Sequence, residues 1–192
     1  MKKIVLLAVM LAAAPSFAEE EKAEAESEEN EKISRFHVGV HGSVRGSFSG
    51  GESEAFYGGG AFLTYVAIHK WLEIELVVDL IAGSHEIEDS GVKLQASTVR
   101  LPIDLLLKKP FHISKHFHPF VGIGPTLVYE HETFSGGAPS AQRWSGGGTA
   151  VAGVDIWISR HAGLVLEAAY SLLAANGIEH EVGGSLGALI EF

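Results

Sequence analysis

The chain has 192 residues, a net charge of −10 at pH 7 and no cysteine. The length fits one compact domain, the missing cysteine excludes a disulfide framework and a lipid-anchored N-terminus, and the negative charge argues against nucleic acid as a partner. Beyond residue 18, no apolar run approaches the ~18 residues that a membrane helix requires.

Residues 1–18 are typical of a secretory signal peptide. Lys2 and Lys3 supply a charged start, residues 4–14 form a short apolar core, and Ser16-Phe17-Ala18 offers small residues at a cleavage site. Residues 19–32 follow with eight Glu and two Lys and with no aromatic or β-branched residue. Because such a segment has nothing to bury, we expect an acidic, disordered N-terminal arm. The exported, folded domain is then residues 33–192.

Alternating apolar and polar residues predict eight β-strands in this domain. We expect them over residues 35–48, 55–68, 71–83, 92–107, 118–130, 145–158, 163–172 and 179–192. The connections alternate between polar or glycine-rich loops and tight turns, except that residues 108–117 form a longer, basic turn. Long external loops and short periplasmic turns are the asymmetry of outer-membrane barrels. The sequence therefore predicts an all-β, eight-stranded antiparallel up-and-down transmembrane β-barrel, a monomer in the outer membrane of a Gram-negative cell and in contact with its lipid.

Charged side chains decide which face of each strand meets lipid. In the third strand, Glu73, Glu75 and Asp79 alternate with apolar residues, and turning them towards lipid would cost on the order of 1–3 kcal/mol each near the bilayer midplane. The same test on the other strands predicts an inward polar set, which consists of His37, His41, Arg45, Glu73, Glu75, Asp79, Arg100, Asp104, Asp155, Glu167 and Glu191. Because an eight-stranded barrel has an interior just wide enough for side chains, we expect a salt-bridge plug, with a narrow or gated pore and a proton-linked function as alternatives.

Three details of the strands are less regular. Residues 55–68 are apolar on both faces, so their orientation stays open. Lys93, Gln95 and Ser97 fall on the lipid-facing parity, which indicates either a bulge near residues 96–98 or a strand end that rises above the membrane. Trp71 and Trp157 have the inward parity, which places them at the lower rim of the lumen.

Three further motifs resemble functional sites. His112, His116 and His118 have a spacing that suits a transition metal, but no Asp, Glu or Cys lies between them to complete a closed site. His41 and Ser43 share one face of the first strand, as in an acyl-ester hydrolase, without an evident orienting acid. The glycine runs 58–60 and 146–148 lack the context of a phosphate loop. No catalytic residue, cofactor or metal is predicted, although metal binding by the histidines stays open.

Several segments resemble a known family. Residues 101–107 (LPIDLLL) and 119–125 (PFVGIGP) resemble strands four and five of small OmpA-like, porin-like outer-membrane barrels, and residues 147–158 (GGTAVAGVDIWI) and 164–170 (LVLEAAY) resemble strands six and seven. The C-terminal residues Leu186, Ala188, Ile190 and Phe192 are similar to the signal that such proteins present to the barrel-assembly machinery. The resemblance implies an eight-stranded barrel, here without the peptidoglycan-binding domain of OmpA. It does not imply one activity.

The favoured function is that of a non-enzymatic integral outer-membrane barrel with a role in envelope structure or surface interaction, its external ligand unknown. The alternatives are a small pore or gated channel, an enzyme acting on outer-leaflet lipid, and a secreted lipocalin-like binder. Lipid A deacylases of this fold use a lipid-facing His and Ser late in the barrel, whereas His41 and Ser43 lie early and face inwards. A lipocalin is disfavoured because the acids of residues 71–83 would then lie outside.

Overall fold

The structure, a computed structural model, describes residues 36–49, 52–68, 71–89, 92–135, 139–174 and 177–192. The predicted signal peptide (1–18) and acidic arm (19–32) lie outside these residues. Within the described ranges, no helix is long and apolar enough to cross a membrane.

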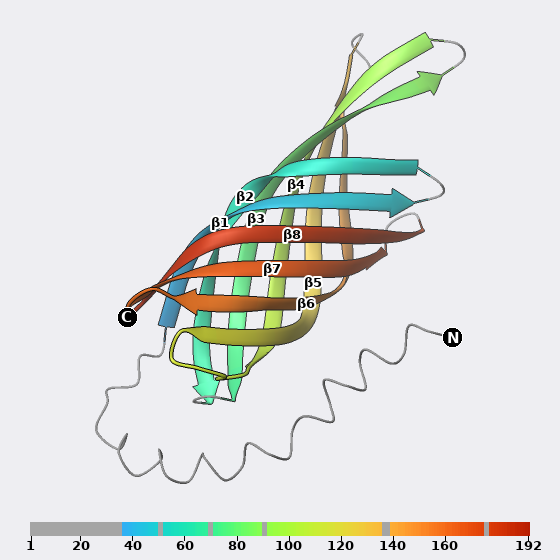
Figure 1. Cartoon of the computed structure of the whole chain (residues 1–192). Coiled ribbons are helices and arrows are strands. Elements are labelled where there is room, and N and C mark those ends of the chain that lie inside the picture. Colours follow the sequence, from blue (N-terminus) through green and yellow to red (C-terminus); the bar gives the residue numbers. More distant parts are fainter. Residues whose placement is uncertain (1–35, 50–51, 69–70, 90–91, 136–138, 175–176) are drawn as a thin grey trace, which may run out of the picture. The chain divides into compact units, whose positions relative to one another are not determined.

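Eight antiparallel strands pair in chain order and close into a barrel, with β1 hydrogen-bonded to β8 (Figure 1). The predicted all-β barrel is thereby confirmed. The strands are β1 (Phe36–Ser49), β2 (Glu52–Ile68), β3 (Leu72–Asp89), β4 (Val92–Pro110), β5 (Phe117–Phe134), β6 (Ala141–Trp157), β7 (Ala162–Ala174) and β8 (Ile178–Glu191).

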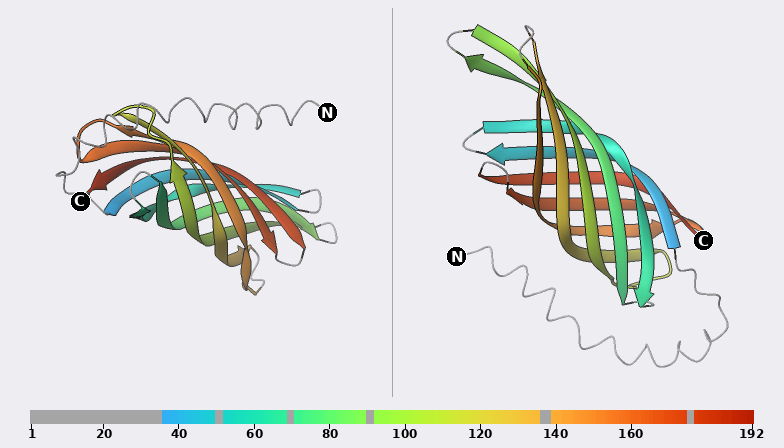
Figure 2. Two further views of the ribbon diagram at one scale, coloured as in Figure 1. Left: turned by 90° about the horizontal axis from the view of Figure 1, so that it is seen from below. Right: turned by 180° about the vertical axis from the view of Figure 1, so that it is seen from behind.

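Several strands run further than the sequence pattern predicts. β3 has 18 residues and β4 has 19, whereas about 9–11 residues cross a bilayer. Residues 81–89 pair with residues 92–100 in one continuous register, so segment 84–89, predicted as a loop, is strand. Of the two alternatives at residues 96–98, the register excludes the bulge and leaves an extended strand. Figures 1 and 2 show the β3–β4 hairpin projecting beyond the neighbouring strands.

The connection predicted between residues 130 and 145 is also shorter in the structure, because β5 continues to Phe134 and β6 begins at Ala141. The two strands stay paired up to Glu132 and Ala141. The barrel wall therefore extends at this end as paired strands rather than as irregular loops. Main-chain hydrogen bonds hold these extensions together, because the N–H and C=O groups of each strand pair with those of its neighbour.

The orientation of β2, which the sequence left open, follows from burial. Phe56, Phe62 and Thr64 are buried in the lumen, whereas Tyr57 and Leu63 are exposed on the outer surface. The outer wall of the barrel is therefore apolar along this strand too. A continuous apolar exterior is what a strand needs where it crosses the hydrocarbon layer.

At the short-turn end, two predictions about inward residues need correction. Trp71 is exposed rather than at the lower rim of the lumen, because it lies in the turn before β3 and not within the alternating strand. The basic turn predicted to begin at residue 108 begins only after Pro110. Lys108 consequently belongs to β4 and is buried. Trp157, by contrast, is buried as its parity indicates.

Gly39 of β1 gives a test of packing between the wall and the lumen. A Cβ at this position would overlap the ring of Phe62 and the carbonyl oxygen of Ala188. Gly39→Ala should therefore lower the free energy of unfolding by about 1–3 kcal/mol, the usual cost of overpacking. Urea unfolding in phospholipid vesicles measures it. The control is Gly42→Ala, whose Cβ would meet nothing closer than the Gly58 oxygen at 3.9 Å, and an equal loss in both variants would contradict the prediction.

Candidate functional site

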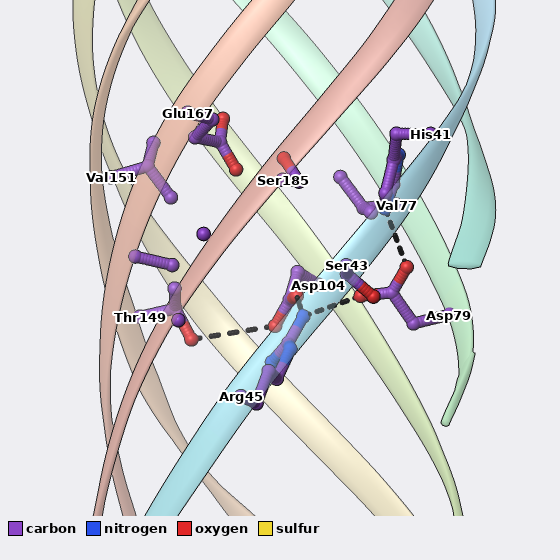
Figure 3. A pocket seen from close by; sticks show the side chains of 13 residues that line it. His41, Ser43, Arg45, Val77, Asp79, Asp104, Thr149, Val151, Glu167 and Ser185 are labelled. Atoms are coloured by element: carbon purple, nitrogen blue, oxygen red, sulfur yellow. Dashed lines mark hydrogen bonds and ion pairs between the residues drawn. The ribbon is translucent and has the colours of Figure 1, made fainter. Parts of the chain in front are cut away.

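The centre of the lumen is crossed by ion pairs from Arg45 of β1. Its Nη2 lies 2.6 Å from Asp79 Oδ2 on β3 and 3.3 Å from Asp104 Oδ2 on β4 (Figure 3). The second oxygen of Asp79, Oδ1, lies 2.6 Å from His41 Nε2. These contacts join strands that are not neighbours in the barrel wall, so they span the interior. A buried carboxylate is tolerated only when it is bonded in this way.

A second arginine stands further towards the projecting hairpins. Arg100 of β4 is 1% exposed, and its Nε and Nη2 each lie 2.8 Å from a carboxylate, those of Glu130 and Glu179. Its Nη1 contacts Glu181, which also lies 3.7 Å from Arg45 Nη1. The two arginines and their acids therefore form one connected network across the lumen. Charge-assisted hydrogen bonds of this kind are the strong ones.

Hydroxyl groups donate further hydrogen bonds to two acids of the network, Asp104 and Glu179. Thr126 donates to Asp104 Oδ1 at 2.6 Å and also contacts Thr149. Ser47 donates to Glu179 Oε1 at 2.6 Å. These hydroxyl groups help to keep Asp104 and Glu179 buried, since each of the two acids accepts a hydrogen bond as well as facing a cation.

In the half of the lumen nearer the short turns, called the inner half below, the central cation is Lys108 rather than an arginine. Its Nζ donates to both oxygens of Glu75, at 3.1 and 3.0 Å, and lies 3.8 Å from Glu167. Thr64 donates to Glu75 at 2.7 Å. The ammonium also lies 3.6 Å from the centre of the Phe120 ring, a favourable cation–π position.

An apolar layer lies beside this lysine, which faces the ring of Phe120, and of its members only Trp157 was predicted from the sequence to lie in the lumen. It comprises Phe62, Val77, Leu106, Phe120, Val151, Trp157, Val165 and Leu189. Trp157 donates from Nε1 to His118 Nδ1 at 3.0 Å and packs edge-on against His37, with 5.5 Å between ring centres. A hydrophobic constriction excludes water and so opposes the passage of ions.

Between the two halves lies a small cavity, drawn in Figure 3. Its volume is about 20 Å³, and its lining includes His41, Ser43, Asp104 and Glu167. This is room for about one water molecule. The buried Ser43 hydroxyl has no hydrogen-bond partner among the described residues, so a single water there would satisfy it.

The structure places the predicted inward residues in two groups. Arg45, Glu73, Glu75, Asp79, Arg100 and Asp104 are buried, and His37, His41, Asp155, Glu167 and Glu191 are partly buried. Direct contacts join His41, Asp79, Arg45 and Asp104, while Lys108 joins Glu75 to Glu167.

Sequence reasoning missed four members of the network. Glu130, Glu179 and Glu181 lie towards the ends of predicted strands, and Lys108 was assigned to a turn. All four continue the inward parity of their own strands, as the burial pattern of β8 illustrates. Applying the alternation to the whole of each predicted strand would have found the three glutamates, and extending the fourth predicted strand by one residue would have found Lys108.

Two of the three histidines near the β4–β5 turn, His116 and His118, form hydrogen bonds with Trp157. His116 Nδ1 lies 2.9 Å from the Trp157 carbonyl oxygen, and His118 accepts the indole hydrogen bond. The rings of His112 and His118 lie 4.5 Å apart. Over the described residues, no group of three or more His, Cys, Asp and Glu side chains is arranged to hold a metal ion.

His41 and Ser43 gain an acid that the sequence did not indicate. Asp79 binds His41 in the manner of an orienting carboxylate. However, the same carboxylate is held by Arg45, and the adjoining cavity has room only for about one water molecule. This cavity is too small to hold an acyl chain beside the pair.

Comparison with protein families decides the classification of the chain. The family described as outer membrane protein beta-barrel domain matches residues 4–188. The chain belongs to this family. It is therefore an integral outer-membrane barrel, with its exposed apolar wall in contact with lipid.

Solved structures agree with the classification at the level of fold. OprG of Pseudomonas aeruginosa is 15% identical, with a TM-score of 0.63 over 83% of this chain and 96% of that one. Neisserial surface protein A is 15% identical, with a TM-score of 0.59 over 82% and 97%. Ail of Yersinia pestis, in complex with the heparin analogue sucrose octasulfate, is 13% identical, with a TM-score of 0.55 over 83% and 100%. No curated protein matches the chain.

Proposed function

We propose that this protein is a non-enzymatic outer-membrane barrel with a closed lumen, which contributes to envelope structure or to interactions at the cell surface. The observation that carries the proposal is the filling of the lumen. Ion pairs around Arg45 and Arg100 cross its centre and outer half, and Lys108 with the apolar layer fills the inner half. Ions need a continuous hydrated path to cross a barrel, and the cavity at the centre has room for about one water molecule.

The projecting strands support a role at the surface. The β3–β4 hairpin is held against β5 beyond the last residue pair of the ladder, because Ser135 N–H donates to the Gln95 oxygen at 2.9 Å and Gln95 N–H donates to Ser135 Oγ at 2.9 Å. His85 lies 3.0 Å from Glu54, which fastens β3 to β2 near the same end. A surface built from fastened strands presents its side chains in fixed positions, which lowers the entropic cost of binding a partner.

The experiment that tests the closed lumen is ionic current across a planar bilayer. We expect the refolded protein to give no steady current. The pore alternative instead requires discrete, lasting conductance steps.

The non-enzymatic proposal makes its own prediction. His41→Ala and Ser43→Ala should leave the lipid A of expressing cells unchanged, because neither side chain can reach a lipid. Mass spectrometry of extracted lipid A checks this. If wild-type expression removes an acyl chain from lipid A and either variant abolishes the change, the protein is an enzyme.

For biogenesis, we infer export by the signal peptide 1–18, cleavage before the acidic arm 19–32, and insertion of a monomer by the barrel-assembly machinery. The outward stripe of Leu186, Ala188, Ile190 and Phe192 supports this, since all four are exposed on the outside of the closing strand and its end. An exposed apolar stripe along the closing strand β8 is available for recognition before the barrel closes.

A further inference from the structure

The short-turn end of the barrel carries three cations in or next to its turns. We call Lys109, Lys115 and Arg160 the basic rim. Lys115 and Arg160 are exposed in the turns 111–116 and 158–161, and neither turn contains Asp or Glu. Both turns are therefore positively charged, although the net charge of the chain is −10. The field of such a patch attracts anions to this end of the molecule.

Hydrogen bonds fix the turns that hold the basic rim. Trp157 N–H donates to the His116 carbonyl oxygen at 2.9 Å, so the β4–β5 turn is fastened to the end of β6, directly before the β6–β7 turn. Phe111 N–H donates to the Pro119 oxygen at 2.7 Å. Lys109 Nζ lies 5.1 Å from the centre of the Trp71 ring. The cations are therefore held beside the barrel wall rather than on free loops.

Apolar side chains beside the cations mark the depth of the basic rim in the membrane. Trp71 and Phe111 are exposed, and Ile113 and Ile158 are 62% and 67% exposed. Aromatic residues gather at the membrane–water interface, where the ring meets the headgroups. Because the same turns carry the cations, Lys115 and Arg160 lie at the level of the lipid headgroups.

We propose that the basic rim binds the phosphate headgroups of anionic phospholipids, such as phosphatidylglycerol, in the leaflet that the short turns face. Lysine and arginine can bury their apolar stems against the wall and extend their charges to the headgroup. The nearby tryptophan and phenylalanine rings anchor the same lipid region, so charge and apolar contact act together. This inference rests on membership of the outer-membrane family and not on whether the lumen conducts.

The test measures lipid selectivity with the full exported chain refolded in phosphatidylcholine vesicles. Spin-labelled phosphatidylglycerol and spin-labelled phosphatidylcholine are compared by electron paramagnetic resonance, which separates lipids at the protein surface from bulk lipid. The wild type should prefer phosphatidylglycerol, and the triple variant Lys109→Gln, Lys115→Gln and Arg160→Gln should lose that preference. Each neutralised cation should lower the relative association constant by up to about fivefold, less as salt is added.

Arg143→Gln is the matched control for Arg160→Gln, because it removes the same charge at the opposite end of the barrel, where the Arg143 side chain is 44% exposed. Heat-modifiable gel mobility verifies that each variant remains folded. The proposal is overturned if the wild type shows no preference, if the folded triple variant keeps it, or if Arg143→Gln lowers it as much as Arg160→Gln. The last result would indicate an effect of net charge alone.

Discussion

Replacing Arg100 with methionine should lower the free energy of unfolding by about 3–5 kcal/mol, the usual cost of leaving buried charges without their partner. Arg100 is the common cation of Glu130, Glu179 and Glu181. Methionine has a similar length but no charge, so these carboxylates would face one another in the lumen. Urea unfolding in phospholipid vesicles, followed by tryptophan fluorescence, measures the loss.

Two comparisons separate the buried charge from the loss of packing. Arg143→Met removes a cation that also contacts Glu130 and Glu179 but is 44% exposed, and exposed ion pairs contribute only about 0–1 kcal/mol. Adding Glu181→Gln to Arg100→Met should recover part of the stability, because one uncompensated charge is removed. Equal losses for Arg100→Met and Arg143→Met would contradict the account.

Replacing Lys108 with methionine should have an effect of similar size, again about 3–5 kcal/mol. Lys108 is the cation closest to Glu75 and also faces Glu167. Its loss would leave the acids of the inner half without a neighbouring ammonium and would remove the cation–π contact with Phe120. The same unfolding measurement applies.

Lys115→Met is the matched control for this variant, since Lys115 is exposed in the following turn and its loss should change stability by less than about 0.5 kcal/mol. The double variant Lys108→Met with Glu75→Gln should be more stable than Lys108→Met alone. If Lys108→Met is as mild as Lys115→Met, Lys108 does not hold the inner half of the lumen together.

The fold could be predicted because a membrane barrel imposes a simple rule on its strands. Lipid on one side and a narrow interior on the other force apolar and polar residues to alternate, and the acids of β3 fix which parity faces inwards. Strand ends were less predictable. Beyond the hydrocarbon layer the outward positions become polar, as Ser84 of β3 and Thr133 of β5 do, while the ladder of hydrogen bonds continues. Because the alternation of apolar and polar residues stops before the strand does, the sequence pattern predicts these strand ends too early.

The sequence predicts that charged side chains fill the lumen, but it does not predict which of them form ion pairs. Parity alone can assign Arg100 to the interior, but it cannot tell which acids of the neighbouring β5 and of β8, across the barrel, lie beside it. That depends on the stagger of all the strands. The apolar layer was hidden for a related reason, because Phe120 and Trp157 look the same in sequence whether they line a rim or fill the interior. Trp71 was wrongly assigned to the lumen because it lies in a turn, where the alternation of the following strand no longer determines which way a side chain points.

The central claim, a lumen closed by ion pairs and an apolar layer, is tested most directly by single-channel recording across a planar bilayer. The full exported chain is refolded, its barrel is verified by heat-modifiable mobility, and a general porin serves as the positive control for insertion and detection. The account predicts a baseline current indistinguishable from that of the protein-free bilayer. Steady conductance steps that appear only with the folded protein would contradict it.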